Sequence, residues 1–141
     1  MANVARFLID TREAARMPRR VVADRLAPLI QAGVVATCAT LDAEALFSAC
    51  NPAEYEEVCA DRRTAYEYVP TEDEHRQRAF GAQREMARTV RHRAVGVPDL
   101  LTAVLAAEHR LTVIHYDADF DTAGEVIDFG RRWIAEPGII A

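Results

Sequence analysis

Short, mostly apolar segments that end in an acid alternate with longer amphipathic segments along this chain. Residues 4–9 (VARFLI) are closed by Asp10, and residues 111–116 (LTVIHY) are closed by Asp117. Apolar runs of this length fit buried strands, and amphipathic stretches between them are typical of an α/β layered domain. A carboxylate at the end of such a strand cannot build a core, because its burial costs free energy unless a positive group meets it. The pattern therefore predicts an α/β fold that carries a functional site.

The strands and most helices can be placed from this alternation. We expect strands at about residues 4–10, 34–38 and 111–116, and a weak last strand around Trp133. Helices are expected to fill most of the rest. Proline suits the first turn of a helix and glycine its end, which predicts helix starts at Pro18, Pro52 and Pro98 and an end at Gly33, just after Gln31.

Another helix is predicted between Thr71 and Arg93. The sequence TEDE at 71–74 is typical of a capping box with acids in the first turn, and arginines near the other end complement the helix dipole. The residues at helical spacing that we expect to form its buried stripe are Ala79, Phe80, Met86, Ala87 and Val90.

Length, composition and charge narrow the class of protein. The chain has 141 residues, 50% hydrophobic and 28% charged, so we expect one compact domain over residues 1–141. Its 17 basic and 22 acidic residues give a net charge of −5, which argues against coating of the whole surface by nucleic acid but allows a local basic track.

The cysteines and the hydropathy indicate a compartment. Cys38, Cys50 and Cys59 are odd in number and lack Cys-x-x-Cys spacing, so we expect buried thiols rather than disulfides or zinc ligands. No apolar run approaches the roughly 20 residues that span a bilayer, and the N-terminus lacks the pattern of a signal peptide. We expect a soluble cytoplasmic protein with no membrane partner.

Four acids are expected to meet at one edge of the sheet. Carboxyl ends of parallel strands share an edge, so Asp10 and Asp117 lie together if their strands are adjacent. Asp99 follows Val97-Pro98 at a predicted helix start, and Glu44 lies in the first turns of the helix after the second strand. Four clustered carboxylates repel one another unless neutralised, and Mg²⁺ or Mn²⁺ with oxygen ligands fits that need. The sequence therefore predicts a metal-dependent enzyme.

Structural roles for the same residues stay open at this point. Asp10 suits a helix cap, Asp99 is an ordinary acid at a helix start, and Glu44 suits a solvated surface. For Asp121 we favour the role of N-cap for a helix over residues 122–127. An EF-hand loop beginning at Asp117 is set aside, because position six would be threonine instead of glycine and position twelve aspartate instead of glutamate.

Four segments carry a resemblance to a known family. They are FLIDT at 7–11, AEALFSA at 43–49, VPDLLTAVLA at 97–106 and TVIHYDADFDTAGEV at 112–126. In this order the chain resembles the PIN-domain nucleases, and more narrowly the VapC-like toxins of type II toxin-antitoxin pairs. The resemblance covers almost the whole chain, and the last two segments are its specific part. It implies a PIN-like three-layer α/β/α sandwich with a central, mostly parallel sheet.

The resemblance also implies an activity. A protein of this family would be a metal-dependent endoribonuclease and the toxin of its pair. It would hydrolyse phosphodiester bonds in tRNA or rRNA with water activated at Mg²⁺ or Mn²⁺. The implied catalytic and metal-binding residues are Asp10, Glu44, Asp99 and Asp117, with Asp119 joining the metal site. The implied partners are the RNA substrate, a small cognate antitoxin that covers the acidic rim, and a second copy in a homodimer.

The chain departs from the family pattern directly after the first acid. VapC-like toxins usually have a serine and then a small residue after Asp-Thr, whereas this chain has Arg12 and Glu13. Arg12 would either weaken metal binding, grip a phosphate or pair on the surface. This departure leaves open a PIN fold that binds RNA or a partner without cutting. A separate alternative is a PIN-type nuclease of RNA maturation that is not a toxin.

The arginines and histidines of the chain offer further candidate contacts. Two groups of arginines would either contact RNA phosphates or form a solvated face, namely Arg84, Arg88 and Arg91, and Arg16, Arg19 and Arg20. The four histidines lack a shared metal-ligand spacing. We expect them to be satisfied or surface residues, and His115 to have a packing role.

Overall fold

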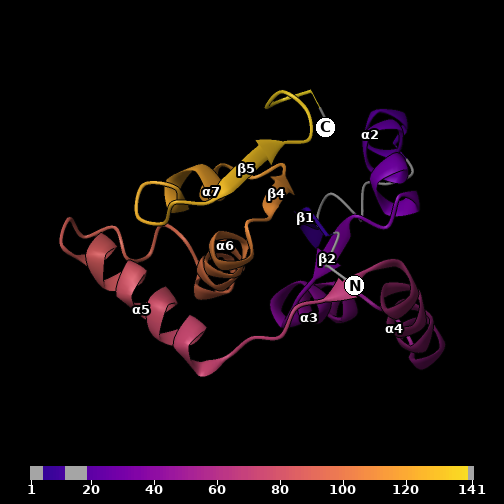
Figure 1. Ribbon diagram of the computed structural model, residues 1–141, viewed down its shortest axis with the longest axis horizontal. Helices are drawn as coiled ribbons and strands as arrows, with labels where there is room; N and C mark the ends of the chain where they lie inside the picture. Colours follow the sequence, from indigo (N-terminus) through magenta and orange to yellow (C-terminus); the bar gives the residue numbers. More distant parts are fainter. Residues whose placement is uncertain (1–4, 12–18, 140–141) are drawn as a thin grey trace.

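A parallel sheet of five strands lies at the centre of the computed structural model, which describes residues 5–11 and 19–139 (Figure 1). The strands are β1 (Phe7–Ile9), β2 (Val35–Thr37), β3 (Glu67–Tyr68), β4 (Thr112–His115) and β5 (Gly130–Trp133). Their order in the sheet is β3-β2-β1-β4-β5, and every neighbouring pair is parallel. The carboxyl ends of all five therefore face the same edge.

Helices connect these strands. They are α2 (Arg20–Gln31), α3 (Ala39–Phe47), α4 (Pro52–Ala65), α5 (Asp73–Ala87), α6 (Val97–His109) and α7 (Ala118–Ala123). As predicted, Pro52 and Pro98 lie in the first turns of α4 and α6. Gly33 follows α2 with φ of 71°, a left-handed conformation that glycine adopts without strain. The predicted helix start at Pro18 lies outside the described residues.

Two hydrophobic cores cover the two faces of the sheet. Side chains alternate along each strand, so Leu8 and Val113 point into one core while Ile9 and Ile114 point into the other. The larger core includes buried side chains of α3, α5, α6 and α7, and the smaller one those of α2. Helices thus lie on both faces of the sheet, and the predicted α/β/α sandwich is confirmed.

Helix α6 is the buried centre of the larger core. Its residues Leu100 and Thr102 to Ala106 are all buried, and in Figure 1 it lies between α5 and the sheet. α5 packs on α6 through Ala79, Ala82 and Met86. The helix that carries Asp99 is therefore held on several sides.

The structure corrects several sequence predictions. The strands are shorter than expected, and β3 was not foreseen because it has only two residues, both exposed. α5 ends at Ala87, which is exposed, and Phe80 and Val90 are 43% and 82% exposed, so their place in the buried stripe was wrong. His75 and Ala82 are buried there instead.

The cysteines only partly match expectation. All three are free, but Cys38 alone is buried, while Cys50 is exposed and Cys59 is intermediate. Among the helices of residues 5–11 and 19–139, none combines the length and the apolar character needed to cross a membrane.

Candidate metal centre

Asp10 and Asp117 come to one edge because their strands are neighbours. β1 pairs with β4 in the register Ile9 to Ile114, and the backbone N–H of Asp10 continues this ladder by donating to the carbonyl of Ile114 at 3.0 Å. Asp10 is only 3% exposed. Asp117 lies two residues after His115, the last residue of β4, and directly before α7. The convergence expected from the strand ends is what the structure has.

The other predicted acids arrive on helices. Asp99 lies in the first turn of α6, where the orphan N–H groups favour a negative charge. Asp117 is the N-cap of α7, and its Oδ1 accepts a hydrogen bond from the N–H of Asp119 at 3.0 Å. One carboxylate oxygen from each of Asp99, Asp117 and Asp119 lies within 4.8 Å of the other two. That spacing suits three ligands of one cation.

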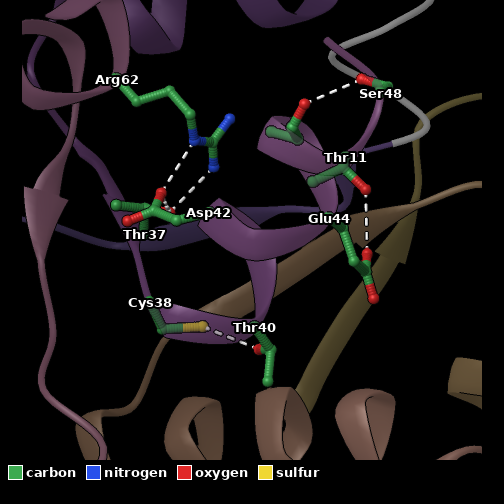
Figure 2. Close-up of polar contacts among 9 residues, drawn as sticks. Thr11, Thr37, Cys38, Thr40, Asp42, Glu44, Ser48 and Arg62 are labelled. Atoms are coloured by element: carbon green, nitrogen blue, oxygen red, sulfur yellow. Dashed lines mark hydrogen bonds and ion pairs between the residues drawn. The ribbon is translucent and has the colours of Figure 1, made fainter. Parts of the chain in front are cut away.

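Glu44 is held in place by a hydroxyl from the first strand's end. Thr11 Oγ1 donates to Glu44 Oε2 at 2.9 Å, as Figure 2 shows. α3, which carries Glu44, is also tied to α6 by a 2.9 Å hydrogen bond between the hydroxyls of Thr40 and Thr102. The sequence reasoning did not assign Thr11 a role, although its place directly after Asp10 was a usable signal.

The pKa of Asp99 reflects the negative charge of the neighbouring acids. Its pKa is raised to about 7, first by burial and then by the negative charges of Asp10, Glu44, Asp117 and Asp119. The other four acids named from the sequence thus all act electrostatically on Asp99. Carboxylate oxygens gathered in this way are the donor set that hard divalent cations prefer, so the residues present fit Mg²⁺ or Mn²⁺.

Asp121 lies outside this cluster and is not an N-cap, which corrects the sequence prediction. It is the fourth residue of α7, whose cap is Asp117. Its carboxylate accepts a 3.0 Å hydrogen bond from Arg131 Nε and a 2.9 Å one from Trp133 Nε1. Asp121 therefore joins α7 to β5.

His115 packs beside the acids, as expected. It is fully buried, with ring centroids 5.1 Å from Phe120 and 5.0 Å from Trp133. Its Nδ1 accepts a hydrogen bond from the backbone N–H of Asp117 at 3.2 Å, and burial lowers the pKa of the ring. Burial thus disfavours the protonated, positively charged form of this ring beside the acids.

A second group of possible ligands, formed by Glu74, His75 and Glu108, does not fit a metal well. His75 Nδ1 accepts a 2.8 Å hydrogen bond from the N–H of Glu72, which leaves the ring proton on Nε2, facing Glu108. A neutral histidine that binds metal through Nε2 needs its proton on Nδ1. His75 is the satisfied, buried histidine that the sequence suggested, and it joins α5 to α6.

The predicted arginine face does not form. Since α5 ends at Ala87, Arg88 and Arg91 lie beyond the helix, and they pair with Glu85 at 3.1 Å and Glu125 at 2.8 Å. Arg19 and Arg20 are exposed. Arg12, Glu13 and Arg16 lie outside the described residues.

Comparisons with known proteins agree with this geometry. The family model described as "PIN domain" matches residues 8–126. The chain belongs to the PIN-domain family. It is 37% identical over 136 residues to Ribonuclease VapC51 of Mycobacterium tuberculosis, covering 96% of this chain and 97% of that protein. It is 35% identical over 133 residues to Ribonuclease VapC21 of the same organism, covering 94% and 96%.

Solved structures show the same fold at low identity. The DNA-bound VapBC structure from Salmonella typhimurium matches with a TM-score of 0.69 and 15% identity, over 93% of this chain and 99% of that one. At this identity the match supports the fold alone. The family resemblance and the PIN-like sandwich expected from the sequence are confirmed.

Proposed function

We propose that this protein is a metal-dependent endoribonuclease and the toxin of a toxin-antitoxin pair. The observation that carries the proposal is the meeting of five acids at the carboxyl edge of the sheet, with the pKa of Asp99 raised to about 7 by burial and by the other four. The ribonuclease names of two relatives more than 30% identical over nearly the full chain support the reaction class. Transfer or ribosomal RNA is the proposed substrate class.

In this proposal the acids hold the metal. Asp99, Asp117 and Asp119 would be ligands of a Mg²⁺ or Mn²⁺ ion, with Asp10 and Glu44 completing the acidic site. The ion would supply an electrophile for the phosphate and lower the pKa of a water, so that hydrolysis of the phosphodiester becomes accessible near neutral pH.

The remaining residues prepare that site. Thr11 fixes one oxygen of Glu44 through its 2.9 Å hydrogen bond, which limits the rotamers that this carboxylate samples. The hydrogen bond from the backbone N–H of Asp119 holds the Asp117 carboxylate at the start of α7. The buried ring of His115 accepts a hydrogen bond from the backbone N–H of Asp117 and so supports the start of α7. A preorganised acidic site loses less entropy when a cation binds.

The proposed function also implies protein partners. The solved neighbours include DNA-bound FitAB, DNA-bound VapBC, and VapBC-5 of the VapBC family of toxin-antitoxin systems. For this chain we propose a small cognate antitoxin that covers the acidic rim, and a homodimer as the assembled toxin.

Cleavage of a total cellular RNA pool tests the proposal. Purified protein is incubated with Mg²⁺ or Mn²⁺, and in parallel with EDTA. Discrete fragments that form only with metal are the expected result, and their ends identify the target. Absence of cleavage by folded, metal-loaded protein would instead favour a PIN fold that binds RNA or a partner without cutting. Fragments from precursor RNAs alone would favour a maturation nuclease.

A further inference from the structure

A hollow of about 370 Å³ lies between α3 and α4. It is at the carboxyl ends of β2 and β3, where Thr37 and Tyr68 end their strands. Its polar and aromatic lining consists of Thr37, Asp42, Arg62, Arg63, Tyr66 and Tyr68. Two arginines and two tyrosines thus line one hollow together with a single acid, Asp42.

Arg62 is fixed within this hollow before any ligand arrives. Its Nε donates to Asp42 Oδ1 at 2.8 Å and its Nη2 donates to Thr37 Oγ1 at 2.9 Å (Figure 2). The guanidinium also lies 4.9 Å from the centroid of the Tyr66 ring. The Arg62 side chain is only 12% exposed, so an anion would have to reach it from within the hollow, through the N–H donors that these two bonds do not use. A guanidinium that is already ordered loses little entropy on binding.

The hollow and the acids share helix α3. Asp42 and Glu44 are two residues apart, so their side chains leave the helix roughly 200° apart. Figure 2 accordingly shows the Arg62–Asp42 contact and the Thr11–Glu44 contact in different directions from α3. With strands about 4.8 Å apart, β3 lies roughly 10 Å from β1, which carries Asp10 to the edge. Roughly three stacked nucleotides span that distance, at about 3.4 Å each.

We propose that this hollow is a subsite for a nucleotide of the RNA substrate that flanks the scissile bond. Tyr68 is 55% exposed and offers a ring face to a base, while Arg62 and Arg63 meet its phosphate. Stacking on an aromatic ring together with arginine contacts is how proteins bind unpaired nucleotides. An acidic peptide would satisfy the arginines but would leave the tyrosine unused. The inference rests on the proposed ribonuclease function and adds a determinant of where the enzyme cuts.

Binding of a fluorescein-labelled single-stranded RNA in EDTA tests the subsite without cleavage. Tyr68→Ala and Arg63→Gln are each expected to weaken binding by about tenfold, the loss of one stacked base or one phosphate contact. Tyr68→Phe keeps the ring and is expected to bind like the wild type. The matched controls are Tyr55→Ala, an exposed tyrosine on α4 outside the hollow, and Arg78→Gln, an exposed arginine on α5. Affinities of the subsite variants equal to those of the controls would overturn the proposal.

Mapping the ends of fragments in Mn²⁺ separates this inference from the nuclease itself. Tyr68→Ala is expected to redistribute cleavage among sites, whereas Tyr55→Ala leaves the pattern unchanged. A wild type that binds RNA through the hollow but never cuts would contradict the nuclease and keep the subsite. A normal cleavage pattern in Tyr68→Ala, with loss only of antitoxin binding, would assign the hollow to a protein partner and overturn the inference.

Discussion

The pKa of Asp99 shows that gathering these acids has an electrostatic cost. Burial and four neighbouring carboxylates raise its pKa from the usual 3.8 to about 7. In the absence of a cation the site therefore favours a proton on Asp99, and with a cation it favours the carboxylate. Proton and metal compete for one group, and this competition has consequences for stability.

The metal-free protein is expected to lose stability as pH rises from about 4 to 7. The folded pKa of Asp99 lies above the unfolded value of 3.8, so its contribution to the free energy of unfolding is full below about 4 and is lost as pH approaches 7. Because Asp99 is only partly buried, solvent screening reduces the effect to roughly 1–2 kcal/mol. Urea unfolding in EDTA at pH 5 and 7.5 measures it. In Asp99→Asn the free energy of unfolding should differ less between the two pH values. If it differs as much as in the wild type, another group is responsible.

Asp10→Asn is expected to abolish cleavage while leaving the fold intact or more stable. The change removes one charge from the cluster at nearly constant volume, so repulsion falls while a metal-binding oxygen is weakened. We expect RNA cleavage to drop by about 100-fold or more and the melting temperature to stay equal or rise.

The control for this substitution is Asp24→Asn, which changes an exposed aspartate on α2. Its cleavage rate and melting temperature should match the wild type. If Asp10→Asn were to unfold together with its loss of activity, Asp10 would be a structural residue and its assignment to the metal site would fail.

At the scale of elements, short helix α7 depends on strand β5 for its position. Asp121 accepts hydrogen bonds from Arg131 and Trp133, and the rings of Trp133, His115 and Phe120 pack between the two elements. α7 in turn carries Asp119 and is capped by Asp117. A contact made by a residue outside the cluster therefore orients two of its acids.

Asp121→Asn is expected to lower metal affinity without removing a ligand. Loss of the charge-assisted hydrogen bond to Arg131, which is partly exposed, should cost about 0.5–1 kcal/mol of stability. Because α7 would move more freely, we expect affinity for Mn²⁺ to fall by about 3- to 10-fold. Calorimetric titration measures this, with Asp128→Asn, an exposed aspartate outside the helix, as the control. Unchanged affinity in Asp121→Asn would limit its role to stability.

The elements also show what the sequence could predict. The ends of β1 and β4 and the start of α6 could be placed because apolar runs, prolines and acids all mark them. β3 could not, since two exposed residues give no periodicity. The buried stripe of α5 was mispredicted because it includes His75. The partner of His75 is Glu108 on α6, and no local sequence pattern reveals a contact between two helices. Asp121 was misread as a cap for the same reason, as its partners lie on β5.

At the scale of the whole molecule, negative charge dominates. The chain carries a net charge of −5, and five acids gather at the carboxyl edge. We therefore expect long-range attraction of RNA to be weak, and binding to depend on local contacts such as those proposed for Arg62 and Arg63.

RNA affinity is accordingly expected to depend only modestly on salt. If two phosphates are neutralised, the slope of log K against log salt is about −1.4 for a single strand. Fluorescence titrations of the single-stranded RNA between about 50 and 300 mM NaCl, a range that brackets physiological ionic strength, measure this slope. A slope steeper than about −4 would contradict the account, because it would require a broad basic surface.

Calorimetric titration of Mn²⁺ into the purified protein tests most directly that the acids form a cation site. We predict saturable binding to the wild type, with affinity at least about 10-fold weaker in Asp99→Asn and in Asp117→Asn and unchanged in Asp24→Asn. Equal binding by all four proteins, or none by the wild type, would contradict the central claim that these acids hold the metal.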